Sequence, residues 1–199
     1  MRGSTAEICK PKAKSEYSRK PQKQIIDAMI NRFFLLILVP MVFAVKLASA
    51  QTLPPDSPAY KRFPNVPPFT ILQADSTNLT KDHLKKHQPT IIMYFSPDCD
   101  HCKHQWADME KRMKDLKKYQ IVMVTYQPFE EMVSFYREQK IASYSNIKMG
   151  RDTKFFLPTF YKIQSLPFQA LYDKNGDLVT TFEGNVKIDK LLAAFKGKD

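Results

Sequence analysis

Two cysteines spaced three positions apart are the residues of this sequence best suited to chemistry. Cys99 and Cys102 frame the tetrapeptide Cys-Asp-His-Cys, and the sequence has only one other cysteine, Cys9. An apolar run at 91–95 comes before the pair, and residues 103–118 after it have helical periodicity. At a strand-to-helix junction a fold can expose one thiolate and keep a second thiol behind it. The pattern predicts thiol–disulfide exchange, with Cys99 as the nucleophile and Cys102 as the resolving thiol.

The residues between and beside the cysteines are charged, so they can tune the acidity of the pair. A Cys99 thiolate gains from the free N–H groups and the dipole at the start of a helix. A protonated His101 adds to this stabilisation, whereas the carboxylates of Asp98 and Asp100 oppose it. An apolar stripe at helical spacing runs through Cys102, Trp106, Met109, Met113 and Leu116. Because Cys102 begins this inward stripe, a shielded resolving role is favoured.

The N-terminal quarter of the sequence has the composition of a targeting segment. Residues 33–45 form an apolar run, which is shorter than the roughly 20 residues that a membrane span requires. Arg32 precedes the run, and the small residues 48–50 follow it. We predict a signal peptide at 29–50, cleaved after Ala50, and an exported, periplasmic or extracytoplasmic location. An uncleaved signal that anchors the chain at the membrane, facing outward, is the alternative.

Residues 1–28 fit no part of a signal peptide, since they are basic and polar. Met29 begins a more natural n-region, so we predict that Met29 is the true start and that 1–28 is an upstream extension. A long n-region is the alternative. In either case Cys9 lies outside the mature fold. The mature chain then consists of a Pro-rich lead-in at 51–66 and one domain at 67–199.

The charge of the mature part does not indicate a nucleic-acid partner. The formal net charge of the whole sequence is +11. Residues 51–199 contain 22 of the 31 Lys and Arg residues and 17 of the 20 Asp and Glu residues, which leaves +5. These basic residues are spread along the chain and form no continuous run. We therefore expect no binding of nucleic acid.

The hydrophobic pattern of 67–199 predicts an α/β domain. Residues 91–95 are apolar throughout, as in a central strand covered on both faces. Early alternation of strands and helices predicts a parallel half, and Asn175-Gly176 predicts a hairpin and so an antiparallel half. The predicted strands are 69–73, 91–95, 119–126, 147–149, 168–172 and 178–182, and the predicted helices are a short one from Thr80, 100–118, 128–139, 155–163 and 186–195.

This layout, together with the segment 94–103 and the later Ser165-Leu166-Pro167-Phe168, resembles exported thioredoxin-like proteins of the TlpA/ResA kind over about residues 67–196. The resemblance implies a thioredoxin fold, a central mixed sheet flanked by helices. It also implies an inserted strand–helix, roughly 129–163, between the C-x-x-C half and the proline half. Pro167 matches the family's cis-proline, with the Leu166 backbone presented to an extended substrate. Pro158 is the competing candidate for a cis bond.

The sequence departs from cytoplasmic thioredoxins at two places. Those proteins carry a buried Asp, which helps to move protons, six residues before the first cysteine, and here the position is Met93. The interior dipeptide is Asp100-His101 where thioredoxins have Gly-Pro, and its histidine is shared with DsbA-type oxidants. The resemblance therefore leaves the direction of electron flow open, and we favour a reductase over an oxidase.

The sequence thus predicts an exported thiol–disulfide oxidoreductase that acts on protein disulfides or dithiols. We expect no bound cofactor and no metal, and a second redox protein that recycles the dithiol. The alternative is a binding or assembly module whose cysteines form a static disulfide or hold a metal. His83 and His87 could complete a tetrahedral zinc site with the two cysteines. Covalent haem attachment is excluded because position 103 is Lys and the motif requires His there.

Overall fold

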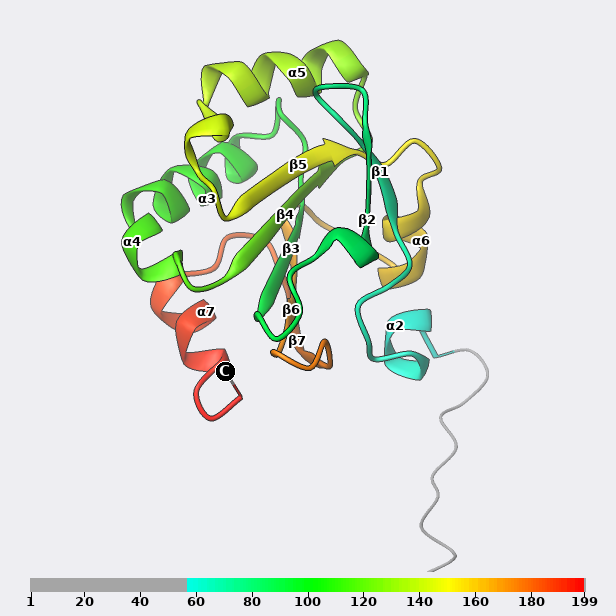
Figure 1. Cartoon of the computed structure of the whole chain (residues 1–199), viewed down its shortest axis with the longest axis vertical. Coiled ribbons are helices and arrows are strands. Elements are labelled where there is room, and N and C mark those ends of the chain that lie inside the picture. The colour runs from blue at the N-terminus through cyan, green and yellow to red at the C-terminus, as the bar shows by residue number, and fades with distance from the viewer. Residues whose placement is uncertain (1–56, 199) are drawn as a thin grey trace, which may run out of the picture. The chain divides into compact units, whose positions relative to one another are not determined.

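A seven-stranded sheet organises residues 57–198, the part of the chain that this computed structural model describes (Figure 1). The predicted upstream extension, the signal peptide and the beginning of the lead-in lie outside the described residues. The strand order is β2-β1-β5-β4-β3-β6-β7. The strands are β1 (Thr70–Gln73), β2 (Asn78–Thr80), β3 (Thr90–Tyr94), β4 (Gln120–Thr125), β5 (Ile147–Arg151), β6 (Phe168–Tyr172) and β7 (Leu178–Glu183).

Helices precede, connect and follow these strands. None of the helices within 57–198 combines the length and the apolar character needed to cross a bilayer. The α-helices are α2 (Ala59–Arg62), α3 (Asp100–Lys111), α4 (Met113–Leu116), α5 (Phe129–Glu138), α6 (Phe156–Tyr161) and α7 (Ile188–Ala194), and the 3-10 helices are η1 (Lys81–His83) and η2 (Ile141–Ser143).

The sheet is parallel at its centre and antiparallel toward both edges. β4 pairs in parallel with β3 and with β5. β6 is antiparallel to β3 and β7, and β1 is antiparallel to β5 and β2. In the chain, β5 and α6 lie between β4 and β6, where the inserted strand–helix was predicted. The architecture is the predicted α/β thioredoxin fold with a mixed sheet.

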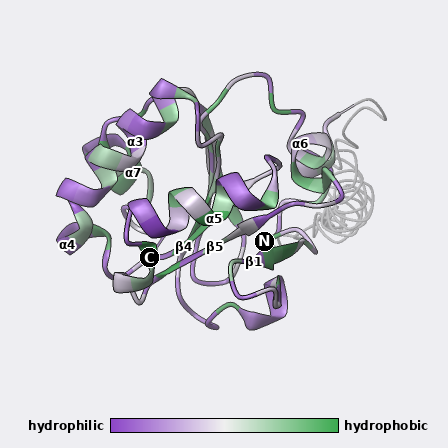
Figure 2. Ribbon diagram, turned by 90° about the horizontal axis from the view of Figure 1, so that it is seen from above, coloured by the Kyte–Doolittle hydropathy of each residue, from purple (hydrophilic) through white to green (hydrophobic). Residues whose placement is uncertain are grey.

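Apolar layers cover both faces of the sheet, because successive side chains of a strand point to opposite faces. Met93 packs in a layer with residues of α3, α5 and α7, whereas the neighbouring Ile92 and Tyr94 pack in a layer with residues of α6. Every residue of β3 and β4 is buried, as predicted for a central strand covered on both faces. Figure 2 shows green segments of these central strands between helices that carry much purple.

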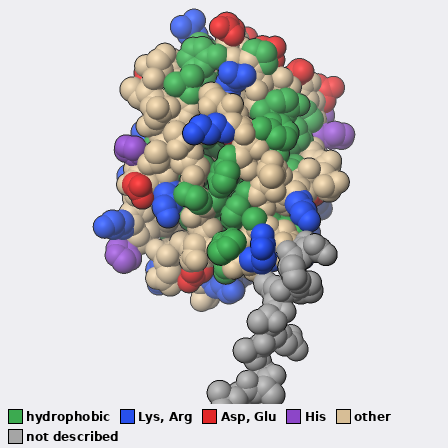
Figure 3. Space-filling view, turned by 90° about the vertical axis from the view of Figure 1, so that its right-hand side faces the viewer, with side chains coloured by type: hydrophobic (Ala, Val, Ile, Leu, Met, Phe, Trp, Pro, Cys, Tyr) green, Lys and Arg blue, Asp and Glu red, His purple; other side chains and the backbone are tan. Residues whose placement is uncertain are grey.

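Among residues 57–198, large hydrophobic side chains also reach the surface at three positions. Phe63 is 62% exposed, Phe155 is 52% exposed and Tyr126 is 40% exposed. The surface on the α6 side shows several groups of hydrophobic side chains among lysines and arginines (Figure 3). The first of the three residues follows α2, and the other two belong to loops near the carboxyl ends of β4 and β5.

The predicted helix 100–118 is wrong as one continuous element. Arg112 leaves helical geometry, with φ −108° and ψ 21°, so α3 ends at Lys111 and α4 follows. Arg112 forms an ion pair with Asp189 of α7 at 3.1 Å. The predicted stripe nevertheless faces inward. Its buried members are Cys102, Trp106, Met109 and Leu116, and Met113 is partly buried.

Two shorter segments also differ from prediction. Residues 78–80 form β2, which pairs with β1, so the predicted helix near Thr80 is only the 3-10 turn η1. Its start is fixed by reciprocal hydrogen bonds between Thr80 and His83. The end of the Pro-rich lead-in belongs to the fold, because the Val66 N–H donates to the carbonyl of Gly176 at 3.0 Å in the β6–β7 turn. The segment 51–66 is therefore not only an extended lead-in, because its end is bonded to the fold.

The inserted strand β5 approaches β1 so closely that Gly150 has no space for a side chain. An added Cβ would lie 2.8 Å from the Leu72 carbonyl oxygen and 3.0 Å from the Ile71 side chain. We predict that Gly150→Ala lowers the free energy of unfolding by about 1–3 kcal/mol, as overpacking typically does. Denaturant melts of the purified protein measure this change. Lys148→Ala, at an exposed position of the same strand, is the control and should leave the midpoint unchanged; an equal effect of both would contradict the close approach.

Candidate active site

Cys99 is the residue that caps the N-terminus of α3. Its backbone is extended, with φ −80° and ψ 117°, and its N–H donates to the Ser96 carbonyl at 3.2 Å. Its own carbonyl accepts the first helical hydrogen bond, from the Lys103 N–H at 3.0 Å. The thiol is half-buried and lies at the positive end of a helix of 12 residues. The helix N-terminus is the position that the sequence predicted for Cys99.

Cys102 lies one turn further along α3 and is fully buried. The two thiols are free and are within hydrogen-bonding reach of each other. Burial raises the pKa of Cys102 to about 12; a backbone hydrogen bond from Ser96 opposes this shift, and the neighbouring Cys99 and Asp98 add to it. At neutral pH Cys102 is therefore a neutral thiol that must lose a proton before it can attack a disulfide.

Ser96 holds the loop that leads into the cysteines. Its Oγ–H donates to Asp98 Oδ1 at 2.7 Å, and its Oγ accepts a hydrogen bond from Gln127 Nε2 at 2.8 Å. These bonds connect the end of β4 to the turn between β3 and α3. Sequence reasoning did not identify Ser96 and Gln127. The Ser-x-Asp spacing is a turn signal that could have indicated the first of them.

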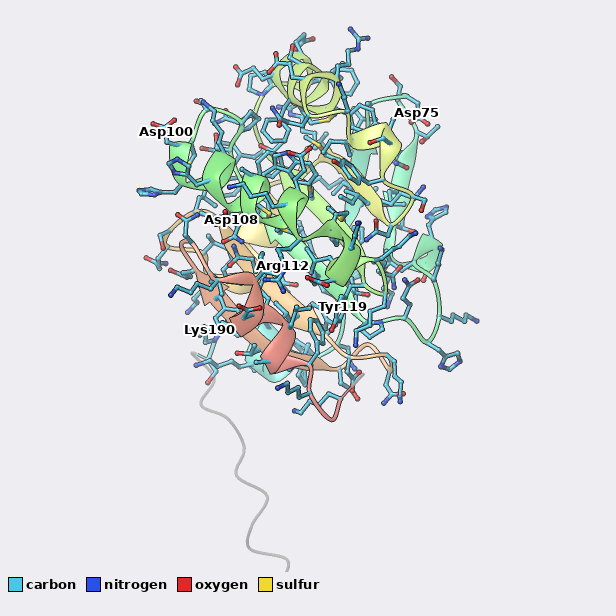
Figure 4. All side chains as sticks on the ribbon, turned by 90° about the vertical axis from the view of Figure 1, so that its left-hand side faces the viewer. Asp75, Asp100, Asp108, Arg112, Tyr119 and Lys190 are labelled. Atoms are coloured by element: carbon cyan, nitrogen blue, oxygen red, sulfur yellow. The ribbon has the colours of Figure 1, made fainter. Side chains whose placement is uncertain are left out.

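Asp100 and His101 flank the buried sulfur but have exposed side chains. Asp100 pairs with Lys103 at 3.7 Å, an exposed contact of the kind that contributes little to stability. Figure 4 shows the Asp100 side chain at the outer end of α3, pointing to solvent. The backbone of His101 is held in place, because its carbonyl accepts a hydrogen bond from Asn185 Nδ2 at 2.7 Å.

The Leu166–Pro167 peptide bond is cis. Leu166 is half-buried and, like Cys99, packs against the core layer under α3, whereas Pro167 is buried. The competing Pro158 lies inside α6. Because β6 is antiparallel to β3, its first residue is paired with the last residue of β3. The structure therefore brings the loop before β6 and the start of α3 to the same end of the sheet.

A third segment, residues 184–186, is fixed at this end of the sheet by side-chain amides. Gln105 of α3 donates through Nε2 to the Val186 carbonyl at 3.1 Å and accepts from the Val186 N–H at 2.7 Å. The N–H of Gly184 donates to the Pro167 carbonyl at 2.8 Å. Sequence reasoning missed this segment, because its partners are distant in the chain and a single glutamine carries no pattern.

Aromatic side chains lie beside the loop that holds the cysteines. The buried Tyr94 stacks on Tyr126 with ring centroids 6.3 Å apart, and Tyr126 contacts Phe155 edge-on at 5.5 Å. Burial raises the pKa of the Tyr94 phenol, so it stays protonated. Phe155 is held in the left-handed region at φ 53°, which is rare for a bulky residue. The outer two rings are partly exposed and form an apolar surface near the end of β4.

The described residues contain no group of three or more His, Cys, Asp and Glu side chains arranged to hold a metal ion. His83 hydrogen-bonds through Nδ1 to the Thr80 N–H at 3.1 Å. His83 and His87 precede the first residue of β3, and the cysteines follow its last residue. The zinc site that combines these four residues is therefore wrong, because the length of a central strand separates the two pairs.

The fold and the dithiol at the start of α3 define a thioredoxin-fold protein with a C-x-x-C motif. A family model of the thioredoxin-like domain matches residues 78–197. This match covers more than half of the sequence, and the chain belongs to the thioredoxin-like family.

Individual relatives are distant. A protein disulfide-isomerase of Ricinus communis is 23% identical over 127 residues, which are 64% of this chain and 22% of that protein. Solved structures with a similar fold include Etrx1 and StoA. The exposed lipoprotein thioredoxin Etrx1 of Streptococcus pneumoniae has a TM-score of 0.51 at 23% identity over 64% of this chain and 97% of that chain. StoA of Bacillus subtilis has a TM-score of 0.52 at 20% identity, over 66% of this chain and 98% of that chain.

The unequal burial of the two thiols predicts unequal reactivity. In a Cys9→Ser background, Cys102→Ser leaves Cys99 as the one thiol, and Cys99→Ser leaves Cys102. A pKa raised from 9.0 to about 12 lowers the thiolate fraction at neutral pH by roughly a thousandfold. We therefore expect iodoacetamide to alkylate Cys102 at least about a hundredfold more slowly than Cys99 at pH 7. Mass spectrometry measures both rates, and the unfolded variants should react alike. Equal rates in the folded proteins would contradict the assignment.

Proposed function

We propose that this protein is an exported thiol–disulfide oxidoreductase that reduces or exchanges disulfides of protein substrates through Cys99 and Cys102. The observation that carries the proposal is the contact between a half-buried thiol at a helix N-terminus and a fully buried thiol one turn away. Membership of the thioredoxin-like family supports the same chemistry. Export rests on the predicted signal peptide at 29–50, with membrane anchoring as the alternative.

In the reducing direction the Cys99 thiolate attacks one sulfur of the substrate disulfide. The other substrate sulfur leaves as a thiolate and takes up a proton. Cys102 then attacks Cys99 Sγ, which breaks the mixed disulfide and releases the second substrate thiol. Two electrons pass from the dithiol to the substrate, and the Cys99–Cys102 disulfide remains. A second redox protein restores the dithiol, and the cycle needs no bound cofactor.

Leu166 and Pro167 are the proposed substrate contacts. They lie at the same end of the sheet as the cysteines, where the backbone of Leu166 can pair with an extended substrate segment. The exposed rings of Tyr126 and Phe155 offer apolar contact for side chains of the same segment. Asp100 and His101 are proposed to tune the dithiol through their charges, since both side chains lie close to the cysteines in the chain and face solvent.

The reductase direction is part of this proposal, and the surroundings of Cys102 agree with it. A dithiol becomes a strong oxidant when its reduced form is stabilised. Burial of Cys102 disfavours its thiolate, and the carboxylate of Asp98 disfavours it further. Neither effect stabilises the reduced pair in the way that an oxidant requires.

Covalent trapping tests the proposed exchange. We predict that Cys102→Ser accumulates mixed disulfides between Cys99 and substrate proteins, because the resolving thiol is gone. Non-reducing electrophoresis of an extracytoplasmic extract shows these adducts, and reduction removes them. The control is Cys99→Ser, which makes the same replacement at the other cysteine. Because it lacks the proposed nucleophile, it should trap little. Absence of adducts from Cys102→Ser would favour the alternative, a binding or assembly module with a static disulfide.

The reduction potential tests the direction of electron flow. We predict a value near that of thioredoxin, about −270 mV, for the Cys99–Cys102 pair. Equilibration of the 51–199 chain with glutathione buffers, followed by acid quenching and alkylation, measures the oxidised fraction. A potential near that of DsbA, about −120 mV, would make the protein an oxidant and would contradict the reductase assignment.

A further inference from the structure

One buried amide oxygen on β6 has no hydrogen-bond donor among the described residues: Oε1 of Gln169. Gln169 lies on β6, two positions after Pro167, and its side chain is fully buried. Its Nε2 donates to the carbonyl of Gly184 at 3.4 Å. This contact sets the orientation of the amide, since the reverse orientation would place two oxygens against each other. Such an unpaired buried acceptor is costly and calls for a functional explanation.

The sheet register places this amide in the core layer under α3. Gln169 is directly opposite Met93 on β3 and Phe182 on β7. Opposed residues of an antiparallel ladder share a face of the sheet. Met93 packs in the same core layer as Cys102. The unpaired oxygen therefore belongs to the layer that contains the buried sulfur.

The segment 184–186 links Gln169 to the helix of the cysteines. Gln169 holds the carbonyl of Gly184, and Gln105 holds both backbone groups of Val186. Asn185 bonds the carbonyl of His101, the residue before Cys102. Three side-chain amides therefore connect the segment 184–186 to β6 on one side and to α3 on the other.

The chemistry of the resolving step creates a need for a polar group at this place. Cys102 must lose its thiol proton to attack Cys99, and burial opposes this loss. The titratable groups that act on Cys102 are Cys99 and Asp98, and both lie toward the surface. From the sheet side, β3, β6 and β7 present Met93, Gln169 and Phe182, and none of these ionises. Gln169 is thus the one of these three sheet positions that carries an oxygen acceptor.

We propose that Gln169 is a positioning residue for the resolving step, in which its Oε1 holds a water molecule that relays the proton of Cys102. This inference rests on the proposed function. As the Cys102–Cys99 bond forms, the Cys102 S–H bond and the mixed disulfide break. The substrate sulfur leaves with the electron pair of the broken disulfide, and the proton passes through the water to that sulfur. The amide guides the proton without ionising, so no charge is buried beside the core.

A two-phase reaction separates this step from the attack by Cys99. In the Cys9→Ser background, the reduced protein is mixed with an aromatic disulfide, dithio-bis-nitrobenzoate, in stopped flow. The first coloured thiolate reports attack by Cys99, and the second reports attack by Cys102 on the mixed disulfide. We expect Gln169→Met, which keeps the side-chain length but removes the acceptor, to leave the first phase unchanged and to slow the second about tenfold. The pH midpoint of the second phase should rise.

Gln120→Met is the matched control. Gln120 is a buried amide at the start of β4, at the opposite end of the sheet, and its amide groups bond to Lys85, Gln88 and Thr90. Its replacement should lower stability but leave both phases unchanged. Wild-type rates in Gln169→Met, or equal slowing of the second phase in both variants, would overturn the role of Gln169. Absence of a second phase in the unsubstituted protein would instead overturn the proposed function, and this inference with it.

If Gln169→Met does not fold, a measurement on the protein that keeps Gln169 still tests the proposal. The side-chain amide resonance of Gln169 should shift when the dithiol is oxidised and Cys102 loses its proton, and that of Gln120 should stay in place. An unmoved Gln169 resonance would overturn the proposal.

Discussion

The central position of β3 is the constraint on which the site depends. Every residue of β3 is buried, with β4 and β6 as neighbours and helices over both faces. After Phe95 the chain must leave the sheet, and the Ser96–Asp98 hydrogen bond closes the turn into α3. The antiparallel ladder with β6 brings Pro167 to the same end. One strand therefore positions both the dithiol and the proline loop.

The helix that follows makes the two cysteines unequal. Residues three apart on an α-helix lie on the same side, one turn apart. Cys99 caps the first turn and stays half-buried, whereas Cys102 lies one turn deeper and joins the core layer. The proposed order of attack, in which Cys99 reacts first and Cys102 resolves, agrees with this difference in burial.

Neutral amides hold much of the loop structure around this site. Gln127 fixes the loop before Cys99, and Gln105 and Asn185 fix the segment 184–186 against α3. A buried charge would need a buried partner, whereas an amide can satisfy backbone groups directly. The same arrangement leaves Cys102 without an ionised neighbour on the sheet side, which is consistent with its raised pKa.

Much of the fold could be predicted because the strands carry local patterns. The strand 168–172 has the predicted bounds, since it is apolar and lies between a proline and a turn signal. The break at Arg112 was not predictable in the same way, because it coincides with an ion pair to Asp189, which is distant in the chain. The strand β2 was missed because three residues with one buried side chain give no periodicity.

The sequence alone determined the dithiol, its place between a buried strand and a helix, and the alternation that makes the domain α/β. These properties depend on neighbouring residues, so they can be read from spacing. Only the tertiary structure decided the placement of β5 beside β1, the separation of His83 from the cysteines, the burial that raises the pKa of Cys102, and the unpaired oxygen of Gln169. Each of these depends on which distant segments pack together, and hydrophobic pattern specifies that a face is buried without specifying its partner.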